Sequence, residues 1–175
     1  MSDIILLEEI IEHNTINTSW FLPFVIHRLQ PLAHNGVVVV DVVLQNILDE
    51  PLMMHPLQLT WKVKNEQISI PPIQDHVITE WAACGLACVV VPLYTNWQVL
   101  QVTQVGDRFD YWVGNEQYEF GLEISGTVRD KLEQRHHLKV RQLLQNRHHV
   151  AGYVSVTSFG IGRSIFFVSP MGKGR

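Results

Sequence analysis

The alternation of hydrophobic and polar positions is most regular after residue 74, where it predicts helices and strands in a clear order. An Ala- and Leu-rich run that opens with an acid predicts a helix over Asp75–Val91, and Pro92 is expected to end it. Thr127, with Asp130 three residues later, is a capping signal for a helix over Val128–Arg147. Short apolar runs bounded by turn residues predict five strands: Trp97–Gln104, Phe109–Val113, Tyr118–Ser125, Gly152–Thr157 and Ser164–Ser169.

The first 72 residues are less regular and carry no chemistry that the sequence identifies. Residues 3–13 predict a short helix with acids in its first turns. Residues 37–48 fit a buried strand or a helix, and their pattern leaves both open. Leu57–Lys64 alternates cleanly and, with a turn at Asn65-Glu66 and a second strand over Gln67–Ile70, predicts a hairpin.

These elements predict an α/β fold with a mixed central sheet flanked by helices. Residues 75–169 are expected to form the core, and residues 1–74 an N-terminal elaboration packed against it. Residues 170–175 are expected to be a loose tail.

Composition limits the classes of protein to which the chain can belong. Of its 175 residues 46% are hydrophobic and 17% charged, which predicts a buried core and excludes general disorder. Two cysteines give no disulfide framework, and the acidic N-terminus is unlike a secretory signal. The apolar run around Trp81–Leu93 is interrupted by Gly85 and Pro92, so we expect it to be too short for a bilayer. We therefore expect a soluble cytoplasmic protein without membrane contact, and the apolar content permits a homodimer.

Charge is distributed unevenly along the chain. Residues 1–127 contain 4 Lys/Arg and 15 Asp/Glu, whereas residues 128–175 contain 9 Lys/Arg and 2 Asp/Glu. The basic block can bind a polyanion such as nucleic acid, especially through the helix predicted over 128–147. The alternative is that the two parts neutralise each other within one fold.

Two acidic residues stand among apolar neighbours at the ends of predicted strands. Glu123 lies between Leu122 and Ile124, and Asp110 lies between two aromatic residues. An acid in such a place is costly to bury unless it is paired or holds a cation. Adjacent antiparallel strands can bring the two carboxylates together, where Mg²⁺ or Mn²⁺ would relieve their repulsion and the carbonyl of Ile124 would add a ligand. The alternative is a pair of solvent-facing carboxylates.

One face of the helix predicted over 128–147 is polar and largely basic. Because the strand that carries Glu123 leads into this helix, its first turns should lie beside the carboxylates. A Lys or Arg there can bind phosphate or stabilise a leaving oxygen, whereas the alternative is an ordinary solvated face. The residues at this helical spacing are Lys131, Arg135, Lys139, Gln142 and Asn146.

The order helix–strand–strand–strand–helix–strand over residues 75–169 resembles the core of the PD-(D/E)XK nuclease-like superfamily. The matching residues are Asp110 in FDYWV and Glu123 in GLEIS. The resemblance implies a restriction-endonuclease-like core and hydrolysis of nucleic-acid phosphodiesters that depends on Mg²⁺ or Mn²⁺. It also implies that Asp110 and Glu123 hold the metal and that Glu80, on the preceding helix, supports it.

The chain departs from this pattern at the family's lysine, whose position two residues after the glutamate is Ser125. The proline of the motif is also absent, since Phe109 precedes the aspartate. We expect Lys139 to take the catalytic role of the lysine. The residues expected to contact phosphate are Arg135, Gln142 and Lys131.

Two further classes of function stay open. The departure at Ser125 favours a catalytically degenerate member of the fold that binds nucleic acid or acts as an assembly subunit. The low charge and acidic first part would also suit an unrelated α/β protein-interaction module.

Other candidate sites are weaker. Cys84 and Cys88 are four apart on a predicted helix, and two ligands do not make a zinc site. The histidines of the doublets His136-His137 and His148-His149 are helix neighbours and point in different directions. The spacing of His136 to Arg135 and Lys139 fits a basic face better than a metal site.

Overall fold

One mixed sheet runs through both parts of the chain in the computed structural model, which describes residues 4–47, 52–64 and 67–169. Within these residues the sheet has eight strands in the order β1-β3-β2-β8-β7-β6-β5-β4. The predicted turn at Asn65-Glu66 and the predicted tail at 170–175 lie outside the described residues.

Groups of two or three consecutive strands are separated by helices along most of the described residues. The strands are β1 (Ile5–Leu6), β2 (Val38–Gln45), β3 (Leu52–Thr60), β4 (Gln98–Val102), β5 (Tyr111–Gly114), β6 (Glu119–Thr127), β7 (Gly152–Ser158) and β8 (Arg163–Val168). The α-helices are α1 (Leu7–Ile11), α2 (Leu22–Leu29), α3 (Asp75–Thr95) and α4 (Leu132–Leu144), with short 3-10 helices η1 (Ser19–Phe21) and η2 (Gln30–Leu32).

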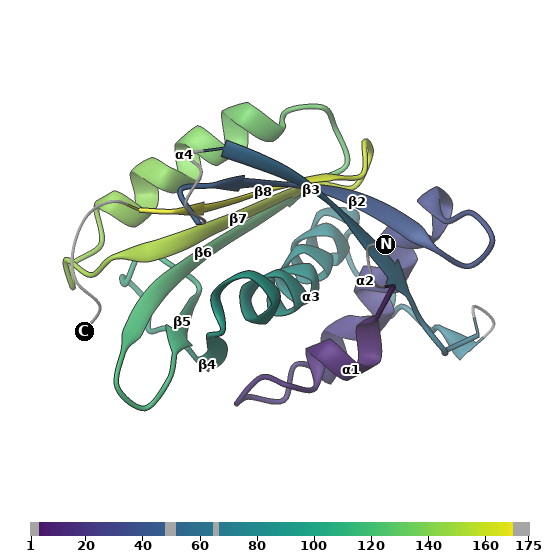
Figure 1. Cartoon of the computed structure of the whole chain (residues 1–175), viewed down its shortest axis with the longest axis horizontal. Coiled ribbons are helices and arrows are strands. Elements are labelled where there is room, and N and C mark those ends of the chain that lie inside the picture. The colour runs from purple at the N-terminus through teal and green to yellow at the C-terminus, as the bar shows by residue number, and fades with distance from the viewer. Residues whose placement is uncertain (1–3, 48–51, 65–66, 170–175) are drawn as a thin grey trace.

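The second part of the chain has the predicted order of elements. Strands β4, β5 and β6 form an antiparallel meander, and α4 then crosses over so that β7 pairs parallel to β6. Strand β8 returns antiparallel to β7. Figure 1 shows α4 on one face of the sheet and α3, with α1 and α2, on the other. The predicted α/β class with a mixed sheet flanked by helices is therefore confirmed.

Strands from residues 1–74 extend the same sheet. Strand β2 pairs parallel to β8, and β3 pairs antiparallel to β2 along its full length. The predicted hairpin of Leu57–Lys64 with Gln67–Ile70 is wrong, because β3 ends at Thr60 and Ile68–Ile70 lie outside any strand. The alternating leucines that suggested the hairpin, Leu57 and Leu59, are instead buried against the core through the pairing with β2.

Helix α3 continues through Pro92 to Thr95, contrary to the prediction that this proline ends it. A proline within a helix has no N–H for the carbonyl four residues earlier, which here is that of Cys88. The side-chain amide of the buried Asn14 supplies the missing donor, with Nδ2 lying 3.0 Å from the Cys88 oxygen. A side chain 74 positions away thus satisfies the carbonyl that the proline leaves without a backbone donor.

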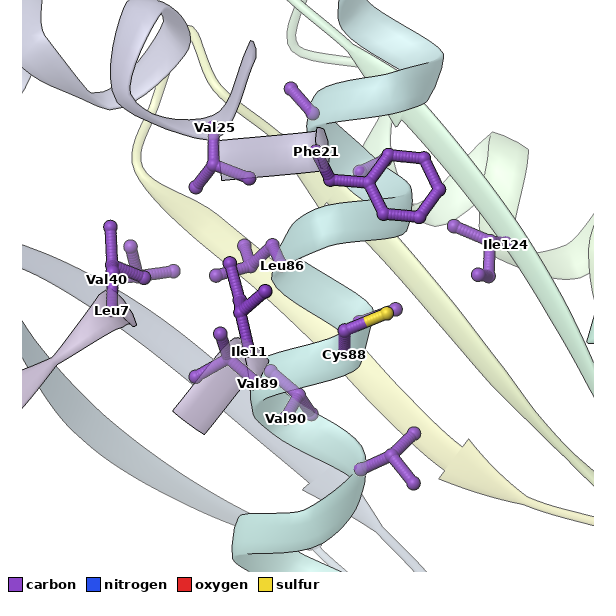
Figure 2. Close-up of a cluster of buried hydrophobic side chains, with 14 of the residues drawn as sticks. Leu7, Ile11, Phe21, Val25, Val40, Leu86, Cys88, Val89, Val90 and Ile124 are labelled. Atoms are coloured by element: carbon purple, nitrogen blue, oxygen red, sulfur yellow. The ribbon is translucent and has the colours of Figure 1, made fainter. Parts of the chain in front are cut away.

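The larger of two hydrophobic clusters surrounds α3, as Figure 2 shows for side chains from α1, α2, β2 and β6. Helix α3 has 21 residues and is apolar enough, by length and composition alone, to cross a membrane, so it exceeds the short run expected from the sequence. Eleven of its residues are buried, which is typical of the core helix of a folded domain. Gly85 permits the close packing with α2, because a Cβ there would lie 2.3 Å from Cγ2 of Val25.

Two predicted helices are shorter than expected. Helix α1 covers only Leu7–Ile11, since Ile5 and Leu6 pair with the end of β3. Helix α4 begins at Leu132 rather than Val128, because the Thr127 hydroxyl accepts a hydrogen bond from the Arg129 amide and holds a turn there.

Candidate functional site at the open end of strand β6

The end of β6 has an edge without a neighbouring strand. Pairing with β5 stops where Tyr111 lies opposite Leu122, yet β6 continues to Thr127. Two acidic side chains occupy the place of the missing strand. The amide of Ile124 donates to Oδ2 of Asp110 (2.7 Å), and the amide of Gly126 donates to Oε2 of Glu80 (3.1 Å).

Glu80 reaches this edge from α3 because position 126 has no side chain. A Cβ at Gly126 would lie 2.6 Å from the carbonyl oxygen of Thr79 and 3.0 Å from Cβ of Ala83. Glycine therefore lets α3 approach the strand closely enough for the Glu80 carboxylate to accept the Gly126 amide.

Glu123 points from β6 to the opposite face and is fully buried. The ammonium of Lys139, on α4, contacts its Oε1 as an ion pair. Its second oxygen, Oε2, is buried and has no hydrogen-bond partner among the described residues. One oxygen of a buried carboxylate is thus neutralised, and the other is left without a donor or cation.

The environment disfavours negative charge on these carboxyl groups. Burial, and then the charge of Asp110, raises the pKa of Glu123 to about 8, although Lys139 opposes the shift. Burial also raises the pKa of Asp110, against the opposing effects of the Ile124 amide and Lys139. Burial alone would lower the pKa of Lys139, but Glu123 and then Asp110 hold it above its ordinary value, so its ammonium stays charged.

Arg135, on α4, lies beside Ser125 at the end of β6. Its Nη1 is 3.0 Å from Oγ of the buried Ser125 and 3.5 Å from Oε1 of Glu80. Arg135 and Glu80 are each 42% exposed, so this ion pair is open to solvent and can be exchanged for another partner.

The predicted site residues therefore fall into two groups. Asp110, Glu123, Glu80, Lys139 and Arg135 meet at the end of β6. Lys131 stands at the N-terminal end of α4 and lines the two cavities beside them. Gln142 lies further along α4 and lines neither cavity, and the buried Asn146 hydrogen-bonds the backbone of Leu143 and Val150 at the helix end.

The donor set suits a hard divalent cation. Asp110 and Glu123 offer carboxylate oxygens, and the unpartnered Oε2 of Glu123 is a vacant acceptor. The carbonyl of Ile124 points to the same strand edge as its amide, toward Asp110. No group of three or more His, Cys, Asp or Glu side chains is placed to hold a metal within residues 4–47, 52–64 and 67–169. Magnesium often takes only one or two carboxylates, with carbonyl and water oxygens completing its shell, so the residues present fit it.

A second charged cluster was not predicted from the sequence. The buried Asp107 lies 2.6 Å from Arg147 and 2.9 Å from Nε2 of His148, which ties the turn between β4 and β5 to the end of α4. Arg147 and His148, to which the sequence assigned no role in a site, hold this acid. No sequence signal marks the pairing, because its partners are about 40 residues apart.

Comparison of the chain with protein-family models, with curated proteins and with solved structures gives no match.

Proposed function

We propose that the protein is a metal-dependent nuclease-like protein that hydrolyses phosphodiester bonds of nucleic acid at the end of β6. The observation that carries this proposal is the meeting of Asp110, Glu123 and Lys139, with one buried carboxylate oxygen left unpartnered. Buried carboxylate oxygens are normally satisfied by donors, so the unpartnered oxygen of Glu123, beside Asp110, supports a cation at this place.

The topology is consistent with the proposal. The sequence α3–β4–β5–β6–α4–β7, with an antiparallel meander followed by a parallel crossover, is the order that the resemblance to the PD-(D/E)XK core implies. Asp110 lies immediately before β5 and Glu123 lies within β6, close to the second- and third-strand positions that the resemblance implies.

The residues at the end of β6 have separate roles in the proposed hydrolysis. Asp110, Glu123 and the carbonyl of Ile124 would hold Mg²⁺ or Mn²⁺, with Glu80 as support, and the metal would polarise the phosphate and supply hydroxide near neutral pH. Lys139 places a permanent positive charge beside the reacting phosphate and stabilises the charge that develops on it. Arg135 and Lys131 bind the phosphate oxygens.

A second candidate is a member of the same fold that binds nucleic acid without cutting it. The observation that favours it is the existing neutralisation of the site: Lys139 pairs with Glu123, and Arg135 pairs with Glu80. In that case the basic residues of α4 hold the polyanion, and metal has no effect on the bound strand.

A cleavage assay separates the two candidates. Labelled single- and double-stranded DNA and RNA are incubated with manganese and with wild type, Asp110→Asn, Glu123→Gln or Glu119→Gln protein. Glu119 is the matched control, since it lies on the same face of the same strand but is half-exposed. We expect cleavage by wild type and Glu119→Gln, and a loss of at least about a hundredfold in the other two. Binding without cleavage by wild type would establish the second candidate instead.

A further inference from the structure

A basic cavity opens beside the carboxylates, between the start of α3 and the loop at residues 127–131. Its volume is about 220 Å³, and its basic lining residues are His76, Arg129, Lys131 and Arg135. A second cavity of about 380 Å³ lies on the other side of Lys131 and Arg135, and Lys139 also lines it. Cationic side chains thus run without interruption from the proposed catalytic lysine to Arg129.

The acids in the first cavity are already engaged. Asp75 forms an ion pair with Arg28 at 2.5 Å, and Glu80 pairs with Arg135. Neither the guanidinium of Arg129 nor the ammonium of Lys131 has a carboxylate partner in the part of the chain that the structure describes. The cavity therefore has two uncompensated positive charges and attracts an anion.

The loop that carries Arg129 is fixed by buried hydroxyl groups. Thr127 accepts the Arg129 amide at 3.0 Å, and the Ser158 hydroxyl donates to the Arg129 carbonyl at 3.0 Å. The carbonyl of Thr127 also accepts the amide of Phe159. Since Thr127 and Ser158 are buried, the backbone is held in place while the Arg129 side chain stays exposed. A rigid loop with a free cation is preorganised for binding.

We propose that this cavity binds a second phosphate group of the substrate, adjacent to the phosphodiester at the carboxylates. The inference rests on the proposed function and deepens it: the substrate is a polynucleotide strand rather than a mononucleotide or a small cyclic phosphodiester. The sugar-phosphate backbone of this substrate strand would run from Lys139 past Arg135 and Lys131 to Arg129. Contacts of this kind fix the position of the strand without reading its sequence.

The test measures the affinity of the protein for a labelled single strand of about 20 nucleotides without metal, by fluorescence anisotropy at several salt concentrations. The variants are Arg129→Ala and Arg129→Lys, with Arg141→Ala as control. Arg141 is an exposed residue of α4 that lines neither cavity, so its removal changes the net charge equally. We expect Arg129→Ala to weaken binding about tenfold and lower the salt slope by about 0.7, with Arg129→Lys close to wild type and Arg141→Ala within about twofold.

Two results would overturn the inference. One is an equal effect of Arg129→Ala and Arg141→Ala, and the other is competition by a nucleoside monophosphate as effective as that by the strand. Failure of the proposed function is separate from both. A strand that binds through Arg129 but is not cleaved with manganese supports the phosphate subsite and removes the hydrolytic activity. Cleavage by wild type that is unchanged in Arg129→Ala supports the hydrolytic activity and rules out the phosphate subsite.

Discussion

Glu123 is the residue on which the chemistry of the site depends most. It is fully buried, one of its oxygens contacts Lys139, and the other has no partner among the described residues. Burial and the charge of Asp110 favour the protonated acid, Lys139 favours the carboxylate, and a divalent cation would favour the carboxylate further. The same carboxyl group is therefore a cost to the empty protein at high pH and a ligand when a cation is present.

This environment makes the stability of the protein depend on pH. The pKa of Glu123 rises from an ordinary value of 4.5 to about 8 on folding. The contribution of its neutral carboxyl group to the free energy of unfolding is therefore fully present below about pH 4.5 and is lost as the pH rises toward 8. Glu123→Gln cannot ionise and keeps its contribution. We expect its unfolding temperature, relative to wild type, to increase by roughly 5 °C between about pH 5 and pH 8. The measurement is thermal unfolding followed by circular dichroism.

Glu119→Gln is the control for that series, and its curve should run parallel to that of wild type at every pH. A constant difference between Glu123→Gln and wild type would show that Glu123 ionises as readily as an exposed carboxylate, against this account.

At the residue scale the sequence predicted the meeting of Asp110, Glu123 and Lys139, because strand periodicity and helical spacing together decide which residues face each other. It did not predict the hydrogen bonds from the β6 edge to Asp110 and Glu80, nor that Arg129 would line a cavity. Those depend on where β5 separates from β6 and on a turn held by Ser158, which lies 29 residues away from Arg129.

At the scale of elements, α3 depends on a single distant side chain. Asn14 donates to the carbonyl of Cys88, which Pro92 leaves without a donor, and its Oδ1 accepts the amide of Val99 at 2.9 Å. It therefore connects the end of α1, the middle of α3 and the edge strand β4. Proline was a sound stop signal locally, but the prediction could not include a donor supplied from elsewhere in the fold.

Removal of this connection is expected to be costly. Asn14→Ala leaves two buried backbone groups without partners, each worth about 1–3 kcal/mol. We expect the free energy of unfolding in urea to fall by about 2–4 kcal/mol. The control Asn17→Ala changes an exposed residue that accepts hydrogen bonds from nearby Ser19, and it should cost less than about 1 kcal/mol. Equal losses in the two variants would contradict the role given to Asn14.

At the scale of the whole molecule, one sheet joins residues 1–74 to the strands that carry the site. The parallel pairing of β2 with β8 makes this connection, and Figure 1 shows the N-terminal strands continuing the sheet beyond β8. The class of fold followed from the sequence, since the order of segments with helical and with strand-like hydrophobic periodicity defines it. The pairing of β2 with β8 did not, because nothing in either strand marks a partner more than 100 residues away.

The uneven distribution of charge along the chain is also explained by the fold of the whole molecule. The acidic first part contributes Glu80 and Asp110, and the basic part contributes Lys139, Arg135, Lys131 and Arg129. Both halves of the asymmetry meet at the end of β6. Internal neutralisation and polyanion binding are therefore not exclusive, since some cations pair with acids while Arg129 and Lys131 have no carboxylate partner in the described ranges.

The central claim is that Glu123 exchanges its proton for a divalent cation, and calorimetric titration of manganese between about pH 6 and pH 8.5 tests it most directly. Binding must displace that proton below its pKa, so the affinity of wild type should rise by up to about tenfold per pH unit toward pH 8 and then level off. Glu123→Gln should bind weakly at every pH, and Glu119→Gln should follow wild type. Manganese affinity that is the same in wild type and Glu123→Gln, or that does not change with pH, would contradict the account.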